Sequence, residues 1–387
     1  MAAASRAASA RRPAAAAHPS QSILTIDLGA IAANYRRLRR ELTQAVCAAV
    51  VKADAYGLGA ARVAPALAAM GCRDFFVAHL GEALDLRRAL PRDAAIYVLN
   101  GLLPGEETEF RRGGFIPVLN DLRQVAHWSK LACAGRRALA AVLHVDTGMS
   151  RLGLAEAEAM ALAADRSRLA GLDLRYVMSH LAVADEPAHE LNRAQLAAFA
   201  HVRAAFPDVR ASLANSSGIF LGPAYQFDLV RPGSALFGIN PLPGRPNPLR
   251  QVVRLQGKIL QIHEVDPPRS VGYGATHRVA GRTRIATVAA GYADGWPRSL
   301  SNRGSAYLGD VRVPVIGRVS MDLLTLDITN APAAVKPGAL VELLGDRLPV
   351  DDVAEAAGTI GYEILTRLGR RYHRVYRGRL SRRNAGR

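Results

Sequence analysis

The residue with the clearest chemical potential in this sequence is a lysine at the end of an apolar run. The segment AVVKADAYGLG places Lys52 after four Ala and Val residues, and only four of the 50 basic side chains of the chain are lysine. An ammonium group buried at a strand end is costly, so such a lysine tends to lose its proton or to react with a carbonyl group. A Schiff base with pyridoxal phosphate (PLP) is one solution. The alternative is a lysine that extends its ammonium to the rim of a barrel.

Further polar side chains end apolar runs in the first half of the chain. Arg151 lies in DTGMSRLG, where its guanidinium could hold a carboxylate or a phenolate, or could be structural. Asn215 and Ser216, in ANSSG, could cradle a phosphate dianion or form an ordinary capping turn. His180, in MSHLAVADE, could equally be a hydrogen-bonded histidine of the fold.

The segment VRPGSALFG adds Arg231 together with Gly233 and Ser234, whose backbone N–H groups are further donors; alone, Arg231 could belong to an ion pair. Later in the chain, Tyr273 lies between two glycines in SVGYGATH, where close backbone approach is allowed. Met321, in GRVSMDLLTLD, and Tyr362, in TIGYEILTRLGRR, have no distinctive signal of their own.

The elements that must position these residues alternate between two kinds. Short β-branched runs are separated by Ala- and Leu-rich stretches of helical character, and the runs begin near residues 45, 74, 96, 115, 141, 175, 211 and 227. Near-continuous apolar strands separated by helices indicate a parallel sheet covered on both faces, and eight such units predict a (β/α)8 barrel. Lys52, His180, Asn215, Ser216 and Arg231 close these runs, where such barrels keep their chemistry.

Differences in composition and pattern divide the chain into three parts. Residues 1–21 are Ala-rich and of low complexity, which predicts a disordered extension. Residues 22–250 hold the predicted barrel. Residues 251–387 have short strands and turn signals, and predict a mainly β second domain with a basic tail.

Charge and cysteine content exclude several classes of protein. The net charge is +17, but 12 of these charges lie before residue 23 or after Glu363, so a broad basic face on the body is not indicated. Cys47, Cys72 and Cys133 form no CxxC pair and predict reduced thiols in a cytoplasmic protein, not a metal cluster. The sequence has no apolar run of membrane-spanning length.

Taken in order, nine segments resemble the alanine racemase family: AVVKADAYGLG, DTGMSRLG, MSHLAVADE, ANSSG, VRPGSALFG, VGYGAT, AGYADGW, GRVSMD and GYEIL. Together they span roughly residues 22 to 376. The resemblance implies a PLP-dependent isomerase of fold type III, with an N-terminal (β/α)8 barrel, a C-terminal mainly β domain, and a homodimer whose active site is shared across the interface.

The resemblance also assigns roles. Lys52 would hold PLP as a Schiff base and act as the base on the D face of alanine, and Tyr273 of the partner subunit would act on the L face. Arg151 and Met321 would bind substrate, and Arg231 would face the pyridine nitrogen beside His180. The remaining cofactor-binding residues would be Tyr56, Asn215, Ser216, Gly233, Ser234 and Tyr362.

One position departs from the family pattern. Members often have a carbamylated lysine seven residues before the equivalent of Arg151, and its negative charge orients that arginine. This chain has His144 there. A bound anion, a nearby carboxylate or no equivalent group could take over this part. Tyr292 and Tyr362, which would line the opening of the substrate pocket, are kept.

Three other functions fit these residues less well than a racemase. A PLP-dependent decarboxylase of this fold would pair the pyridine nitrogen with glutamate, whereas VRPG supplies arginine. A PLP carrier would lack the second domain with Tyr273 and Met321. Nucleic-acid binding through the tails would need stacking aromatic residues and a basic groove, so no nucleic-acid partner is expected. The resemblance therefore favours a cytoplasmic racemase that supplies D-alanine for peptidoglycan.

Overall fold

The first half of the chain is a parallel barrel. The structure is a computed structural model that describes residues 20–378. Within them, seven parallel strands pair in sequence order. These strands are β3 (Ala49–Val50), β4 (Asp74–Val77), β5 (Ala95–Val98), β6 (Ile116–Leu119), β7 (Leu139–His144), β8 (Leu172–Met178) and β9 (Arg210–Ser212). The predicted fold class is confirmed, and each predicted run contains a strand.

A short eighth strand closes the barrel. β10 (Leu229–Val230) pairs in parallel with β2 (Val46–Cys47), which a single residue, Ala48, separates from β3. On its other side, the Arg231 N–H donates to the Ala214 carbonyl just after β9 (2.9 Å). The eighth predicted run is therefore the segment that joins the two edges of the curled sheet.

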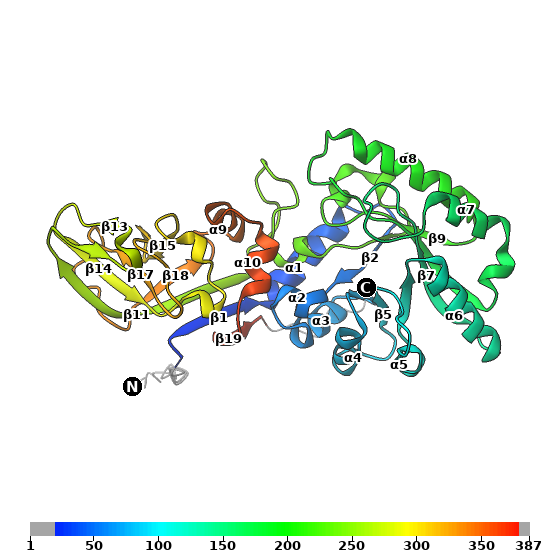
Figure 1. Cartoon of the computed structure of the whole chain (residues 1–387), viewed down its shortest axis with the longest axis horizontal. Coiled ribbons are helices and arrows are strands. Elements are labelled where there is room, and N and C mark those ends of the chain that lie inside the picture. Colours follow the sequence, from blue (N-terminus) through cyan, green and yellow to red (C-terminus); the bar gives the residue numbers. More distant parts are fainter. Residues whose placement is uncertain (1–19, 379–387) are drawn as a thin grey trace, which may run out of the picture.

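Helices cover the outside of this barrel because each buries one apolar face against the strands (Figure 1). Asp27 and Asp121 cap two of them by accepting the N–H groups of Ala30 (2.9 Å) and Gln124 (2.8 Å). The helices are α1 (Leu28–Arg40), α3 (Ala60–Ala69), α4 (Leu80–Ala89), α5 (Glu107–Gly113), α6 (Leu122–Ala134), α7 (Glu156–Ala164) and α8 (Glu190–Ala205).

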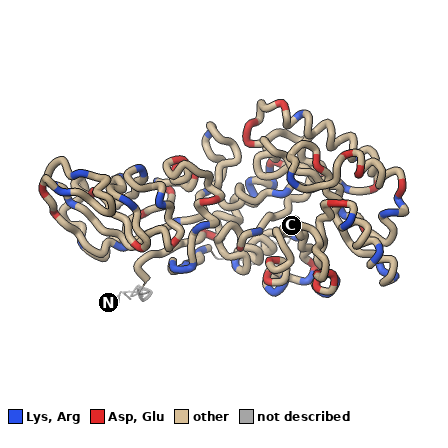
Figure 2. Tube along the Cα trace, in the orientation of Figure 1, with Lys and Arg blue, Asp and Glu red and all other residues tan. Residues whose placement is uncertain are grey.

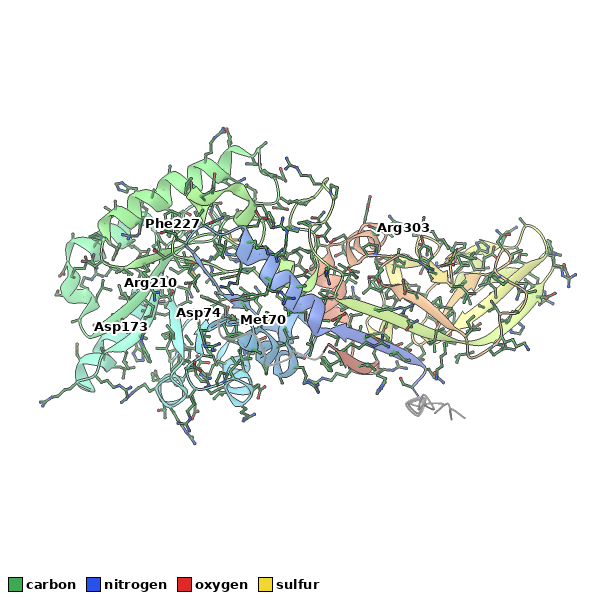
Figure 3. The ribbon with its side chains drawn as sticks, turned by 180° about the vertical axis from the view of Figure 1, so that it is seen from behind. Met70, Asp74, Asp173, Arg210, Phe227 and Arg303 are labelled. Atoms are coloured by element: carbon green, nitrogen blue, oxygen red, sulfur yellow. The ribbon has the colours of Figure 1, made fainter. Side chains whose placement is uncertain are left out.

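Aromatic rings fill the barrel interior below the strand ends. Phe76 stacks on Tyr97 with ring centroids 4.4 Å apart, and Tyr97 meets Tyr176 edge-on at 6.1 Å. At the floor, the Tyr97 hydroxyl donates to Asp74 (2.8 Å), and Arg210 lies 4.5 Å from the Tyr176 ring centroid. Figure 3 labels Asp74 and Arg210 at this end of the barrel. A filled interior leaves the opposite, C-terminal ends of the strands free for a site.

The second domain is built on one long strand, β11 (Val253–Val265). It pairs antiparallel with three strands, at residues 22–26, 283–288 and 340–344. The other strands of the domain are β12 (Ser270–Val271), β13 (His277–Arg278), β14 (Thr283–Val288), β15 (Ser305–Leu308), β16 (Val311–Pro314), β17 (Leu324–Asp327), β18 (Leu340–Leu344) and β19 (His373–Arg377). Two helices, α9 (Val350–Ala357) and α10 (Gly361–Arg367), lie between the sheet and the barrel (Figure 1).

The first described strand, β1 (Ser22–Asp27), belongs to this sheet although its residues fall in the range predicted for the barrel. It pairs antiparallel with β11 and in parallel with β19. Its short apolar sequence, SILTID, resembles that of a barrel strand, and only long-range pairing distinguishes the two. The predicted domain boundaries stay a prediction. Residues 1–19, within the predicted extension, and 379–387 of the predicted tail lie outside the described residues.

Charged residues of both signs are interspersed along both domains (Figure 2). Many are paired, as in Arg254 with Glu342 (2.5 Å) and Arg175 with Asp173 (2.8 Å). Within residues 20–378, no helix is both long and apolar enough to cross a membrane.

The junction of β1 with β11 and β19 supplies a stability test. Leu24, at the centre of β1, is fully buried (0% exposed), whereas Leu260 of β11 is 39% exposed. Leu24→Ala should lower the free energy of unfolding by about 2–5 kcal/mol because it leaves a cavity, and Leu260→Ala should cost less than about 1 kcal/mol. Urea unfolding followed by circular dichroism measures both. Equal losses would show that β1 is not part of the core.

Candidate active site

A cavity of about 510 Å³ opens at the C-terminal ends of the barrel strands. Every predicted site residue except Tyr273, Tyr292 and Met321 lines it: Lys52, Tyr56, Arg151, His180, Asn215, Ser216, Arg231, Gly233, Ser234 and Tyr362. A larger cavity of about 820 Å³ lies at the opposite ends of the strands and is rimmed by arginines such as Arg87 and Arg137. It holds none of the predicted groups, so the smaller cavity is the candidate site.

Lys52 follows β3 after one residue, Val51, and is half-buried in this cavity. Burial and the charge of Arg151 lower its pKa, and the nearby carboxylate of Glu82 opposes them. A lowered pKa leaves a larger fraction of the amine unprotonated near neutrality. Lys52 can therefore act as a nucleophile toward a carbonyl group or as a base.

An unusual turn follows the lysine. The element α2 (Lys52–Tyr56) begins at the lysine; Ala53, Asp54, Ala55 and Tyr56 have φ angles of 51 to 56°, and Gly57 continues at 80°. These angles describe one left-handed helical turn, which costs about 1–2 kcal/mol for each residue other than glycine. Such strain persists where the surroundings hold it, and it collects at functional sites.

Arg231 is buried at the centre of the cavity wall, with only 4% of its surface exposed. Its guanidinium donates to the carbonyls of Ser179 (2.6 Å) and Leu213 (3.3 Å) and to the Ser212 hydroxyl. Burial lowers the pKa of Arg231 to about 9, so the group remains a cation near neutrality. Among residues 20–378 it forms no ion pair with a carboxylate, which leaves it able to donate toward a ligand.

His180 is neutral beside this cation. Its Nδ1 lies 3.3 Å from the Arg231 guanidinium, and burial together with the charge of Arg231 lowers its pKa well below the ordinary range. Because arginine can only donate, Nδ1 carries the lone pair and Nε2 carries the proton. The site thus presents His180 as a neutral donor through Nε2.

Small donors gather opposite the lysine. The Ser216 hydroxyl accepts the N–H groups of Gly233 (3.0 Å) and Ala235 (3.2 Å), at the start of a 3₁₀ turn. A Cβ on Gly233 would lie 2.2 Å from the Tyr56 hydroxyl, so only glycine fits there. Burial raises the pKa of Tyr56 and of Tyr362, which keeps both hydroxyls protonated as donors. Backbone N–H and hydroxyl donors in one cradle suit a phosphate dianion.

Asn215, predicted in the same cradle, also has a structural contact. Its side-chain oxygen accepts the Gly218 N–H (2.9 Å), and its amide donates to the Leu181 carbonyl (3.3 Å). Asn215 therefore both caps this turn and lines the cavity.

Arg151 is presented by a loop that Asp146 holds. Burial opposes ionisation of Asp146, but N–H donation from Gly148, Ser150 and Met149 outweighs it and lowers the pKa of this carboxyl. Arg151 itself is exposed at the rim of the cavity, and it has no hydrogen bond or ion pair with another described residue. Its donors face the space that a ligand would occupy.

His144 lines the cavity near Arg151, and a hydrogen bond with Asn120 sets its tautomer. Its Nδ1 lies 2.7 Å from the Asn120 side-chain oxygen, while the Asn120 amide donates to the carbonyls of Leu99 (3.0 Å) and Val118 (2.9 Å). The Asn120 oxygen therefore accepts, so His144 carries its proton on Nδ1 and a lone pair on Nε2. Burial and the charge of Arg231 lower its pKa to about 4, so it supplies a neutral acceptor in place of an anion.

Like Tyr292 of the predicted pocket opening, Tyr273 and Met321 do not line this cavity. They belong to the second domain and are 74% and 54% exposed. Tyr273 begins a 3₁₀ turn between β12 and β13, at the outer end of that domain and far from α2 (Figure 1). If they act at such a site, a second chain must receive them.

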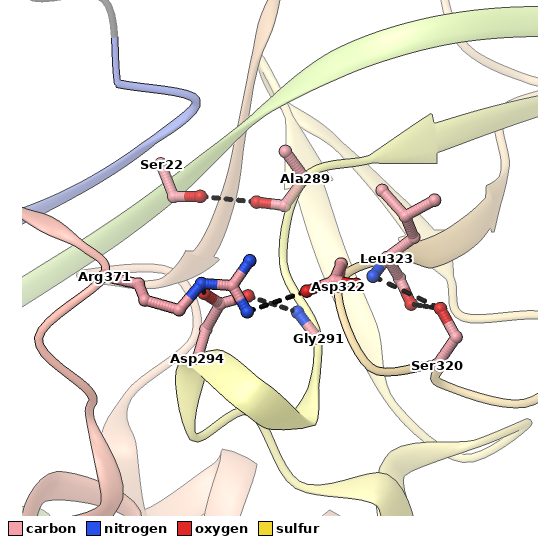
Figure 4. A network of polar contacts seen from close by, with 8 residues as sticks. All are labelled: Ser22, Ala289, Gly291, Asp294, Ser320, Asp322, Leu323 and Arg371. Carbon is pink, nitrogen blue, oxygen red and sulfur yellow. Dashed lines mark hydrogen bonds and ion pairs between the residues drawn. The ribbon is translucent and has the colours of Figure 1, made fainter.

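The loop that carries Met321 is fixed by a polar network (Figure 4). Arg371 pairs with Asp294 (3.1 Å) and Asp322 (2.7 Å), and the Met321 carbonyl accepts the Ala293 N–H (2.9 Å). Tyr292, predicted at the pocket opening, donates its N–H to the Ser320 carbonyl (3.0 Å). Met321 and Tyr292 are thus held side by side on an exposed surface.

Sequence reasoning missed two polar residues near the site. Asn120 ends the run FIPVLN, so the strand-end rule that singled out Lys52 could have found it. Glu82 gives no such signal, because it lies in a helix and reaches the lysine segment only through the fold.

Comparison with known proteins agrees with this geometry. Residues 26–241 match the family described as "Alanine racemase, N-terminal domain", and residues 252–376 match "Alanine racemase, C-terminal domain". The chain is 56% identical over 361 residues to the alanine racemase of Rhodospirillum rubrum, covering 92% of this chain and 96% of that protein. It is 52% identical over 358 residues to a catabolic alanine racemase of Mesorhizobium japonicum, covering 92% and 93%.

Solved structures are similar as well. The alanine racemase of Bartonella henselae with covalently bound pyridoxal phosphate has a TM-score of 0.90 at 42% identity, covering 93% of this chain and 100% of that one. The biosynthetic alanine racemase of Pseudomonas aeruginosa has a TM-score of 0.85 at 36% identity, with the same coverage.

The neutral state of His144 predicts a pH dependence. The unfolded chain, with an ordinary histidine pKa near 6.5, binds more protons than the folded chain between that pH and about 4. The stability that depends on neutral His144 is therefore complete above pH 6.5 and is lost as the pH falls toward 4, by up to about 3 kcal/mol. Unfolding free energies measured from pH 7 to pH 4 should fall less steeply in His144→Gln than in the wild type. The exposed His201→Gln is the control and should keep the wild-type slope.

Proposed function

The chain belongs to the alanine racemase family and is an isomerase that depends on pyridoxal phosphate; on this premise we propose that it interconverts L- and D-alanine with two bases, Lys52 and Tyr273 of the partner subunit. The observation that carries the proposal is the single cavity that gathers a lysine of lowered pKa, a buried arginine, a neutral histidine and a dianion cradle. Racemisation needs one acid/base group on each face of the planar reacting centre, because a single base tends to return the proton to the face it left.

The residues present fit the cofactor. Lys52 would bind its carbonyl carbon, and Gly233, whose position a Cβ could not share with the Tyr56 hydroxyl, leaves room for its phosphate. Ser216, Ser234, Tyr56 and Tyr362 would donate to that phosphate. When bound, the cofactor delocalises the electron pair that remains after the proton leaves the α-carbon.

Arg231 would face the ring nitrogen of the cofactor as a permanent donor. A guanidinium that is still charged at neutral pH donates a hydrogen bond without giving up its proton. Arg231 would thereby leave the ring nitrogen unprotonated, which would limit electron withdrawal and disfavour side reactions such as transamination. His180 supports this role because, as a neutral neighbour, it leaves Arg231 as the donor of the pair.

Lys52 would hold or release the proton on the D face. Its lowered pKa gives it a usable unprotonated fraction near neutrality. On the L face, a tyrosine with an ordinary pKa of about 10 needs cationic neighbours to act as a base. The exposed Arg151 would supply that charge and bind the substrate carboxylate, with the His144 lone pair as its neutral acceptor.

Dimerisation completes the site in this proposal. Tyr273 and Met321 are exposed on the second domain, while the cavity with Lys52 lies in the barrel. A head-to-tail pair would place the second domain of each chain over the barrel of the other, and would bury both side chains. Tyr292 and Tyr362, each 40% exposed, would then narrow the opening and favour alanine over larger amino acids.

We place the activity in the cytoplasm, as the supply of D-alanine for peptidoglycan. The free thiols of Cys47, Cys72 and Cys133 support a reducing compartment. Among the relatives, one is named biosynthetic and another catabolic.

The activity can be tested by the optical rotation of L-alanine. The purified protein loaded with PLP should drive the rotation to zero, because racemisation ends at equal amounts of both enantiomers. Lys52→Ala should lose at least about a thousandfold in rate, since both the cofactor link and one base are removed. Lys336→Ala is the matched control. Persistence of the rotation with bound cofactor would reject alanine as the substrate.

The shared site can be tested by mixing two inactive variants. Lys52→Ala and Tyr273→Phe each damage a different half of the site, so a mixed dimer carries one intact site and one doubly damaged site. Random exchange of subunits should restore about a quarter of the wild-type rate, because half of the dimers are mixed and half of their sites are intact. Sedimentation velocity confirms the dimer. No recovery after demonstrated exchange would place Lys52 and Tyr273 of one chain in the same site.

A further inference from the structure

The left-handed turn after Lys52 needs external support. Four consecutive residues other than glycine have positive φ angles there, from Ala53 to Tyr56. Chains avoid this conformation, and it persists only when neighbouring groups hold it. The turn begins directly after Lys52, so it fixes the backbone on one side of the lysine.

Glu82 holds the start of the turn. Its carboxylate accepts the Ala53 N–H (2.6 Å) and the Ala78 N–H (2.8 Å). Ala78 directly follows β4, which pairs with β3, so one carboxylate links the chain just beyond two neighbouring strands. The Glu82 side chain is 19% exposed; its bond to Ala78 is partly buried, and its bond to Ala53 lies at the surface.

The contact with Ala53 separates Glu82 from an ordinary helix cap. A glutamate in the first turn of a helix often accepts the N–H of its own N-cap residue. Glu82 lies in the first turn of α4, whose N-cap is His79. Its bond to Ala53 spans 29 residues and contributes nothing to α4. That bond acts on the lysine segment.

The end of the turn is held from the second domain. Arg374 of β19 donates to the Gly57 carbonyl (2.5 Å), and the Tyr376 hydroxyl donates to the Leu58 carbonyl (3.0 Å). A Cβ on Gly57 would lie 2.6 Å from the Leu365 carbonyl oxygen, so α10 packs directly on the turn. Both ends of the turn are therefore clamped, one by the barrel and one by the second domain.

We propose that Glu82 is a positioning residue for Lys52, acting through the Ala53 N–H at the start of the left-handed turn, with Arg374 as its counterpart at the end. The inference rests on the proposed role of Lys52. Two charged groups act on the lysine, Arg151 and Glu82, and Glu82 is the negative one. The same carboxylate thus aims the amine and offsets the charge of Arg151.

The test compares Glu82→Gln and Glu82→Ala with Asp85→Asn. Asp85 lies on the same helix, is 79% exposed and pairs with Arg88, so its change should have no effect. Glu82→Gln keeps the shape and one acceptor oxygen, which preserves the fold even if Glu82→Ala unfolds. Arg374→Met tests the other end of the turn independently.

The first readout does not depend on activity. The apoprotein is acetylated at neutral pH, and the rate at Lys52 is compared by mass spectrometry with the rates at Lys130, Lys258 and Lys336. Loss of the carboxylate lowers the Lys52 pKa further and loosens the turn, so the Lys52 rate should rise at least about threefold in Glu82→Gln. Asp85→Asn should leave it unchanged, and Arg374→Met should raise it through loosening alone.

The second readout is the split between kcat and KM for L-alanine in the holoenzyme. Glu82→Gln should lower kcat by about tenfold with KM within about twofold, since the amine is misaimed while substrate contacts remain. Wild-type kcat and wild-type Lys52 acetylation in both Glu82 variants, with Lys52→Ala inactive, would overturn the positioning role alone. Racemisation by Lys52→Ala would instead overturn the proposed role of the lysine.

Discussion

The burial of one guanidinium without a carboxylate partner determines the charge states in the cavity at the C-terminal ends of the barrel strands. Arg231 is satisfied by two carbonyls and a hydroxyl from the segments around β8 and β9, so the barrel must close correctly before the charge can be buried. Burial first, and then the charge of this cation, which is unpaired among the described residues, disfavour protonation of both His180 and His144. The result is a cationic site with neutral histidines, suited to a ligand that brings its own negative charges.

The two domains divide the chemistry between them. The barrel holds the lysine, both arginines and most of the dianion cradle, to which Tyr362 of α10 is added, and aromatic rings fill the barrel interior below them. The second domain carries Tyr273 and Met321 on an exposed face but also reaches into the barrel half, where Arg374 and Tyr376 contact the turn after Lys52. The domain proposed to supply the second base to another chain therefore also supports the first base of its own.

Much of the fold could be predicted because barrel strands carry a local signal. Each of the eight runs contains a strand, and polar residues end them where the cavity opens. The pairing of β1 escaped prediction, since a short apolar strand has the same pattern in a parallel barrel and beside β11. The short β10 could be recognised as a run, but its closure against β2 depends on residues nearly 200 positions apart.

For the site, the sequence alone determined the kinds of groups and their strand-end positions: Lys52, His180, Ser216 and Arg231 are each readable from the few residues around them. The tertiary structure decided their chemical states. Whether His144 is an acceptor depends on Asn120, whether the lysine is held depends on Glu82, and whether Tyr273 reaches a site depends on a second chain. Types and order are local properties of a chain, whereas tautomer, pKa and burial arise from contacts between residues far apart in sequence.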